Sequence, residues 1–168
     1  MKEYLIVDGY NVIHAWPELK GLAQANLEHT RLKFLEKMSN YAGVTGWSVI
    51  VVFDAHGVKQ SGERQEDHSG VQVIYSRENE TADSVIERLA HSMRGERVYV
   101  ATSDWEEQRV VFGSGAYRLS ARQLREEVIR AEKSIKDQSN PSFFGRNLEN
   151  RLSDKVRGVL ELWRRSKS

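Results

Sequence analysis

Short apolar runs alternate along this chain with longer stretches whose apolar residues recur at helical spacing. Apolar runs rich in β-branched residues are typical of strands. The run that ends at Phe53 has no polar alternation, which predicts a central strand covered on both faces. The predicted strands are Tyr4–Val7, Trp47–Phe53, Val71–Tyr75 and Arg97–Thr102.

Helices are expected where apolar residues return every three or four positions. The stretch that begins at Ser120 also has the sequence of a capping box, with Gln123 three positions later. Residues 56–70 are polar and contain glycine, so a loop is expected there. The predicted helices are about Leu22–Tyr41, Thr81–Met93, Trp105–Phe112, Ser120–Asp137 and Leu148–Arg165.

Strands that alternate with helices predict an α/β fold, with a central, mostly parallel sheet and helices on both of its faces. A chain of 168 residues suits one domain with some chain left for an appendage. We therefore expect residues 1–125 to form the α/β body and residues 126–168 to form a basic helical extension packed on the same domain.

The composition excludes several classes of protein. Hydrophobic residues make up 39% and charged residues 29% of the chain, as in globular proteins. No apolar run approaches the roughly 20 residues that a membrane helix needs. The absence of cysteine excludes disulfides, thiolate metal sites and thiol nucleophiles. The N-terminus lacks the layout of a secretory signal, so we expect a cytoplasmic protein that does not bind membranes.

The net charge of +1 hides an asymmetry between the two parts of the chain. Residues 1–117 hold 12 Lys and Arg against 17 Asp and Glu, whereas residues 118–168 hold 13 against 7. An acidic body beside a basic C-terminal third is consistent with a metal centre next to a surface that binds a polyanion. Solvated helices that are rich in arginine explain the same numbers, and both interpretations remain open.

Acidic residues stand at equivalent places after the predicted strands. Asp8, Asp54 and Asp104 each follow the carboxyl end of a strand, and Asp83 begins the helix after the Val71–Tyr75 strand. In open α/β sheets, the carboxyl ends of neighbouring strands converge on one crevice where ligands bind. Two carboxylates 4 Å apart repel each other by about 4 kcal/mol at an effective dielectric constant of 20. A hard divalent cation, Mg²⁺ or Mn²⁺, would relieve that repulsion.

Structural roles compete with this interpretation for some of the acids. Asp83 could stabilise a helix N-terminus, where acids are favoured, and Asp104 could cap the predicted helix that follows it. Asp8 and Asp54 are harder to explain in this way, because each follows an apolar strand directly and has no obvious helix to cap.

Neighbouring polar residues are candidates to assist. Asn11 could hydrogen-bond a metal-bound water or hold its loop, and Gly9 could let the backbone approach a ligand or simply make a turn. Further along the chain, three arginines are spaced to place at least two guanidinium groups on one side of a helix, where they could hold RNA phosphates. These are Arg118, Arg122 and Arg125.

Taken in order, the acidic blocks resemble those of the NYN branch of PIN-like nucleases, and the run that follows them is similar to the YacP family. The ordered set of blocks is far more specific than any one of them. The blocks are Ile6–Asn11, Val52–Asp54, Glu78–Asp83 and Ala101–Asp104, and the later run is Phe112–Arg122.

The resemblance implies a PIN-like three-layer sandwich and cleavage of single-stranded RNA assisted by Mg²⁺ or Mn²⁺. For YacP-type proteins it also implies endonucleolytic mRNA decay coupled to the translating ribosome, with the enzyme entering the decoding site. A monomer is expected. By position, the metal-site acids fall on Asp8, Asp54, Asp83 and Asp104, with Asn11 as the polar helper.

Three other functions fit parts of the same pattern. A phosphoaspartyl phosphatase would need a second acid two residues after Asp8, where this chain has Tyr10. A receiver domain would need paired acids at the end of the first strand and a lysine late in the sheet, and neither expectation is met. A catalytically silent RNA- or ribosome-binding module would be marked by loss of an acid, and none is lost.

Overall fold

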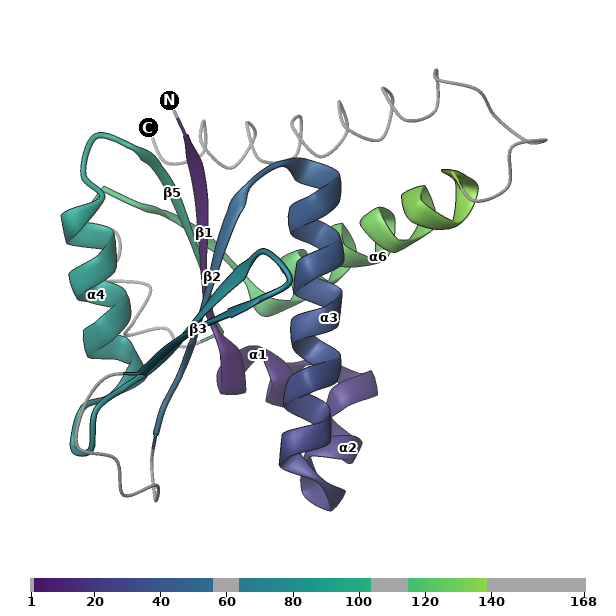
Figure 1. Ribbon diagram of the computed structural model, residues 1–168, viewed down its shortest axis with the longest axis horizontal. Coiled ribbons are helices and arrows are strands. Elements are labelled where there is room, and N and C mark those ends of the chain that lie inside the picture. The colour runs from purple at the N-terminus through teal and green to yellow at the C-terminus, as the bar shows by residue number, and fades with distance from the viewer. Residues whose placement is uncertain (1, 56–63, 104–114, 139–168) are drawn as a thin grey trace.

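A computed structural model describes residues 2–55, 64–103 and 115–138, in which strands and helices alternate (Figure 1). No helix in these ranges has the length and apolar character needed to cross a membrane. The elements are β1 (Glu3–Asp8), α1 (Gly9–Ala15), α2 (Pro17–Ala25), α3 (Leu27–Thr45), β2 (Ser48–Phe53), β3 (Arg64–His68), β4 (Val71–Tyr75), α4 (Ala82–Ser92), β5 (Arg97–Ala101), β6 (Tyr117–Leu119) and α6 (Ala121–Gln138).

The described strands form one six-stranded sheet in the order β3-β4-β2-β1-β5-β6. Every neighbouring pair is parallel except β3 with β4. Strand β1 lies in the middle, between β2 and β5, which agrees with its continuous burial from Leu5 to Asp8. The predicted α/β fold with a mostly parallel sheet is confirmed.

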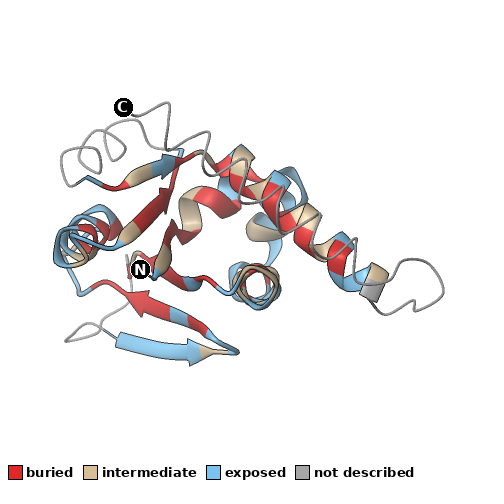
Figure 2. Ribbon diagram, turned by 90° about the horizontal axis from the view of Figure 1, so that it is seen from above, coloured by how far each residue is buried: buried red, intermediate tan, exposed pale blue. Residues whose placement is uncertain are grey.

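Alternate residues of the central strands enter two separate cores, which makes the fold three-layered. Leu5 and Val7 of β1 face helices α1, α2, α3 and α6, whereas Ile6 between them faces α4. Strand β2 divides in the same way, because successive side chains of a strand point to opposite faces. Helices therefore cover both faces of the sheet, and the central strands between them are largely buried (Figure 2).

The chain between β1 and β2 forms three helices where the sequence predicted one. The prediction placed a helix at about Leu22–Tyr41, but Pro17 begins α2 and Asn26 separates it from α3. Asn26 caps α3 by accepting a hydrogen bond from the backbone N–H of His29 at 3.0 Å. Helix α1, only seven residues long, is too short for its apolar spacing to be recognised in the sequence.

Trp16 joins the N-terminal helices to a distant part of the chain. Its side chain is 1% exposed and lies between α1 and α2. The indole Nε1–H donates a hydrogen bond of 2.8 Å to the carbonyl oxygen of Ala121, the first residue of α6. This buried bond connects residues 105 positions apart and fixes the start of α6 against α1 and α2.

Part of the predicted loop at 56–70 is a strand, so that prediction was wrong for Arg64–His68. Strand β3 lies at the sheet edge and turns into β4 through Ser69 and Gly70, both with positive φ. Its side chains are exposed or half-buried, and an edge strand of this kind lacks the apolar alternation that marks a strand in sequence. Strand β6, three residues long, was also not predicted.

The other predicted strands and helices either match the structure or fall outside the described residues. The strands that end at Phe53 and Tyr75 match their predictions within one residue, and α4 and α6 match theirs closely. The predicted boundary after residue 125 lies inside α6, which continues to Gln138. The predicted helices Trp105–Phe112 and Leu148–Arg165 fall outside the described residues.

A buried carboxyl group lies where α6 packs against α3. Glu127 is 1% exposed, and one of its oxygens accepts a hydrogen bond of 2.6 Å from Arg130. Within the described part of the chain, its other oxygen has no hydrogen-bond partner, and neither does the buried hydroxyl of Tyr41 on α3. Burial raises the pKa of Glu127 to about 7; Arg130 opposes this shift and Glu126 adds to it.

Glu127→Gln should therefore make the stability of the protein less dependent on pH. The folded protein holds a proton on Glu127 that the unfolded chain releases above its ordinary pKa of 4.5, so the free energy of unfolding falls as pH rises from there through about 7. We expect Glu127→Gln to melt about 2–6 °C above wild type at pH 8, with the difference shrinking toward pH 4.5. The exposed neighbour substitution Glu126→Gln is the control, and a shift of equal size at every pH would contradict the burial effect.

Candidate active site

The candidate acids gather at the carboxyl edge of the sheet. Asp8 is the last residue of β1, Asp54 directly follows β2, and Asp83 lies in the first turn of α4, which follows β4. Asp8 pairs with Val52 in the register of β1 and β2, so Asp54 stands two residues beyond it on the neighbouring strand. The topology thus brings three of the four predicted acids to the same edge.

The order in which the chain adds strands to the sheet reverses between β1 and β5. Helices α1 to α3 carry the chain from β1 to β2 on one side, whereas α4 carries it from β4 to β5 on the other side of β1. The two connections also cover opposite faces of the sheet (Figure 1). Such a switch point opens a crevice at the carboxyl ends of the two strands, which is where ligands bind in α/β sheets.

Asn11 joins the two sides of this switch point. Its Oδ1 accepts hydrogen bonds from the backbone N–H of Ser103 at 2.6 Å and from the Ser103 hydroxyl at 2.8 Å. The Thr102 hydroxyl donates to the same oxygen at 3.3 Å. A carbonyl oxygen has two lone pairs, so these three donors leave it saturated. Of the two roles considered for Asn11, the geometry supports holding the segment that follows β5.

Asp8 is a buried carboxyl group at the switch point. Its side chain is 8% exposed, and the residue occupies the position before the first turn of α1. The side chain makes no capping hydrogen bond to that helix, so helix capping does not account for an acid here. Asp8 stands where the carboxyl ends of neighbouring strands meet, the place at which α/β sheets bind ligands, and this position makes it a candidate ligand residue.

The two other described acids are more accessible. Asp54 is half-buried, and Asp83 is exposed. Thr81 already caps α4, accepting a hydrogen bond from the backbone N–H of Ser84 at 3.2 Å, so Asp83 is not needed as the cap. Asp83 nonetheless stands in the first turn, where its charge favours the helix dipole, so the structural interpretation of this residue remains open.

The four-acid cluster itself stays a prediction. Asp104 falls outside the described residues. Within residues 2–55, 64–103 and 115–138, no group of three or more His, Asp and Glu side chains is placed so that it could hold a metal ion. The donors at the edge are carboxylate oxygens, which is the ligand type that Mg²⁺ and Mn²⁺ prefer.

Gly9 is required by packing rather than by a ligand. A Cβ atom at this position would lie 2.3 Å from the Phe53 ring, far inside any permitted contact. The backbone of α1 can therefore reach the end of β2 because residue 9 has no side chain. The close approach considered for Gly9 exists, but its partner is an aromatic ring of the core.

The three predicted RNA-binding arginines differ in their surroundings. Arg125 donates from Nε to both carboxylate oxygens of Glu18 on α2, at 2.9 and 3.1 Å, and so ties α6 to α2. Arg122 lies 3.6 Å from Glu126 on its own helix, and Arg118 is exposed on β6. RNA binding by these residues stays a prediction, and the carboxylate partner of Arg125 makes it the least available of the three.

A set of residues at the same edge was missed in the sequence. Tyr10, Phe53 and Tyr75 form an aromatic group at the ends of β1, β2 and β4, and Arg31 and Arg64 lie over its rings. Tyr75 ends β4 and Tyr10 stands two residues after the end of β1, which was the available signal. The arginines come from α3 and from the unpredicted β3, so nothing in the sequence linked them to these rings.

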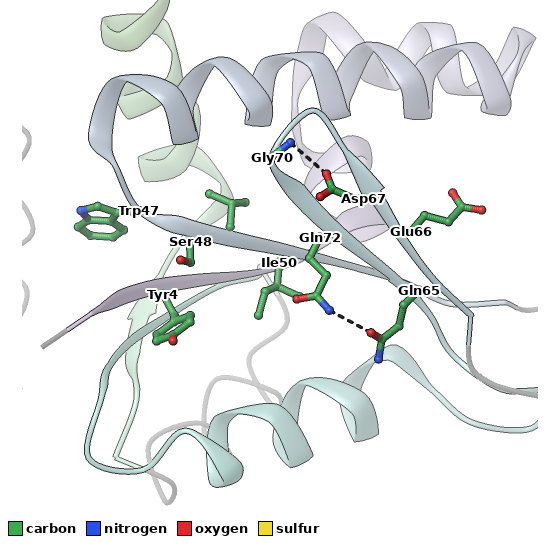
Figure 3. A pocket seen from close by; sticks show the side chains of 10 residues that line it. Tyr4, Trp47, Ser48, Ile50, Gln65, Glu66, Asp67, Gly70 and Gln72 are labelled. Atoms are coloured by element: carbon green, nitrogen blue, oxygen red, sulfur yellow. Dashed lines mark hydrogen bonds between the residues drawn. The ribbon is translucent and has the colours of Figure 1, made fainter.

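A cavity of about 500 Å³ lies elsewhere, at the amino ends of the strands. Ser48 and Gly70, which border it, stand near the starts of β2 and β4, and Asp67 accepts a hydrogen bond from the Gly70 N–H at 3.1 Å (Figure 3). Gln72 donates a hydrogen bond of 3.0 Å to Gln65, and both side chains line the cavity. The cavity is thus at the opposite edge from the acids and does not belong to the candidate active site.

Comparison with known proteins agrees with this architecture. The family model of the YacP-like NYN domain matches residues 5–165. The YacP protein of Bacillus subtilis (strain 168) is 43% identical over 169 residues, which is 97% of each chain.

Two crystal structures of Rae1 (YacP) from Bacillus subtilis are also similar. One, of a tryptophan-to-leucine variant, has a TM-score of 0.73 and 39% identity, over 96% of this chain and 99% of that chain. The other has a TM-score of 0.71 and 44% identity, over 96% and 94% of the two chains. The PIN-like three-layer fold expected from the acidic blocks is confirmed.

Gly9→Ala should destabilise the protein through the Phe53 contact. The new methyl group would push the ring or the start of α1 away, and overpacking of this kind costs about 1–3 kcal/mol in the free energy of unfolding. Gly21→Ala, within α2 and with no atom near the new Cβ, is the matched control and should stabilise by about 0.5–1 kcal/mol. Urea denaturation measures both, and a neutral or stabilising Gly9→Ala would contradict the packing requirement.

Proposed function

Because the chain belongs to the YacP-like NYN domain family, which is nuclease-like, we propose that it is a divalent-metal-dependent endoribonuclease that cuts single-stranded RNA. The observation that carries the proposal is Asp8, a carboxyl group 8% exposed at the switch point between β1 and β5, where it caps no helix. Asp54 and Asp83 share its edge of the sheet.

The proposed reaction is hydrolysis of a phosphodiester bond without a covalent enzyme intermediate. Water adds to phosphorus, the bond from phosphorus to the 3′-oxygen breaks, and the products carry a 5′-phosphate and a 3′-hydroxyl. Mg²⁺ or Mn²⁺, when bound, supplies stabilisation of negative charge on the phosphate and lowers the pKa of water. Asp8, Asp54, Asp83 and Asp104 are the residues proposed to hold it.

The residues of the chain contribute orientation and burial. Asp8 is held by the central strand β1, so its carboxylate has little freedom to move. Asn11 fixes the segment after β5 through Ser103, which keeps the end of that strand against the start of α1. Groups held by strands and by hydrogen bonds position a reacting phosphate more accurately than groups on unsupported loops.

We further propose that the RNA is mRNA on the translating ribosome and that the enzyme acts in the cytoplasm at the decoding site. The basic balance of residues 118–168, 13 Lys and Arg against 7 Asp and Glu, supports binding to RNA. The ribosome coupling rests on the family resemblance of the acidic blocks and of the later run.

A silent binding module with the same fold is the second candidate function. It is favoured by the absence, within the described ranges, of three acidic or histidine side chains placed to hold a metal ion. Such a module would bind RNA or the ribosome through its basic residues and cut nothing.

Cleavage of an mRNA, with and without translating ribosomes, tests the proposal. In Mg²⁺ or Mn²⁺ we expect wild type to cut, and Asp8→Asn and Asp83→Asn to cut at least about 100-fold more slowly, because each loses a charged ligand. EDTA should stop the reaction. Asp67→Asn, in the hairpin at the opposite edge, is the matched control, since asparagine can still accept the Gly70 hydrogen bond.

The outcomes separate the candidate functions. Undiminished cutting by both Asp8→Asn and Asp83→Asn would overturn the proposed site. Cutting of ribosome-bound mRNA but not of free mRNA supports the coupling, and equal cutting of both would overturn it. RNA binding without cutting by wild type in either setting would favour the silent module.

A further inference from the structure

Two arginines lie over tyrosine and phenylalanine rings at the carboxyl edge of the sheet. We name this group the arginine–aromatic cluster; it lies on the face of the sheet covered by α1 to α3. The ring centroids of Tyr10 and Phe53 are 4.8 Å apart, and those of Phe53 and Tyr75 are 5.7 Å apart. The cluster consists of Tyr10, Arg31, Phe53, Arg64 and Tyr75.

Arg31 is held by the rings and by a neutral hydroxyl instead of by a carboxylate. It is half-buried on α3, donates to the Tyr10 hydroxyl at 3.0 Å, and places its Cζ 5.7 Å from the Tyr75 centroid and 6.0 Å from that of Phe53. Among the ion pairs of the described residues, none includes Arg31. Contact with aromatic faces and the charge of Glu28 offset part of the cost of partial burial, but no carboxylate of the described residues forms an ion pair with this guanidinium.

The remaining donors of Arg31 suit a phosphate. A guanidinium has five N–H donors, and those not used for Tyr10 have no acceptor among the described residues. A guanidinium packed on a ring keeps its edge available, and two N–H groups of that edge match two oxygens of a phosphate. The rings thus orient the arginine without consuming its capacity to bind an anion.

Arg64 adds a second charge over the ring of Tyr75. Its Cζ lies 4.2 Å from the Tyr75 centroid, and its Nε lies 3.2 Å from Glu66 on the same strand. Both side chains of that ion pair are more than 40% exposed, and such pairs contribute little to stability. A phosphate can therefore replace Glu66 at small cost, which makes Arg64 a weaker partner of the same site.

The cluster adjoins the candidate acids in the chain and in the sheet. Tyr10 stands two residues after Asp8, and Phe53 directly precedes Asp54. Strand β4, which ends at Tyr75, is the next strand beyond β2 at the same edge. The cluster and the candidate acids therefore border the same edge of the sheet, so a strand of RNA that follows this edge would meet both.

We propose that the arginine–aromatic cluster binds a backbone phosphate of single-stranded RNA adjacent to the bond that is cut, with Arg31 as its principal ligand. This inference deepens the proposed function and rests on it for the identity of the substrate. Phe53 and Tyr75 are too buried to stack on a base, being 0% and 8% exposed, so the arginines that lie over them contact the phosphate backbone. The site therefore selects for a phosphate chain and not for a base sequence.

Equilibrium binding of a 12-nucleotide single-stranded oligouridine by the full chain in EDTA tests this proposal without any cutting. We expect Arg31→Gln to raise the Kd about tenfold, the equivalent of one charge-assisted hydrogen bond. The slope of log K against log salt should become shallower by about 0.7, because one phosphate contact is lost. Arg31→Lys should keep the slope and lose part of the affinity, since it keeps the charge but not the planar edge.

Two further variants complete the experiment. Arg94→Gln removes an exposed arginine just after the end of α4, at the opposite edge of the sheet, and should leave the Kd within twofold of wild type. Arg64 is exposed on β3, so Arg64→Gln leaves the core intact and tests the cluster independently of folding. We expect this substitution to raise the Kd about threefold. Melting temperatures of all four variants confirm that they fold.

The results distinguish this inference from the proposed function. An unchanged Kd and salt slope for both Arg31→Gln and Arg64→Gln would overturn the phosphate site, as would an equal loss in Arg94→Gln. If the cluster variants lose affinity for RNA but the wild-type protein never cuts RNA, the nuclease proposal is wrong and the phosphate site is supported. If the nuclease proposal holds, Arg31→Gln should raise KM about tenfold and change kcat less than twofold.

Discussion

The parallel pairing of β1 with both β2 and β5 is the constraint on which the rest of the structure depends. Because β1 lies between them, the connection from β1 to β2 runs to one side of β1 and the connection from β4 enters β5 on the other side, and the switch point forms between β1 and β5. Asp8 is the last residue of that strand, and Asn11 reaches across to Ser103 beyond β5. Loss of either pairing would separate the residues that the proposed chemistry needs together.

Much of this arrangement follows from local patterns in the sequence. The central strands are apolar on both faces, so their position in the sheet could be predicted from Trp47–Phe53 and its neighbours. The ends of those strands then place Asp8 and Asp54 at one edge of the sheet from the sequence alone. A catalytic role for Asn11 stays a prediction, and the structure shows that its side chain accepts hydrogen bonds from Thr102 and Ser103.

Other features depend on contacts that no local pattern contains. Strand β3 is polar because it lies at the sheet edge, so its sequence is that of a loop. Arg31 belongs to the cluster through the rotation of α3 against the sheet, which tertiary packing alone determines. The requirement for glycine at position 9 likewise comes from a ring 44 positions later in the chain, at Phe53.

The bond from Trp16 to Ala121 has a consequence for the synthesis of the protein. The nascent chain exposes Trp16 early, but its acceptor is made only after 105 further residues. Contacts of such long sequence separation form late in folding, so the N-terminal helices remain incompletely packed until α6 has left the exit tunnel. A protein built in this way cannot complete the packing of its N-terminal helices while most of the chain is still being translated.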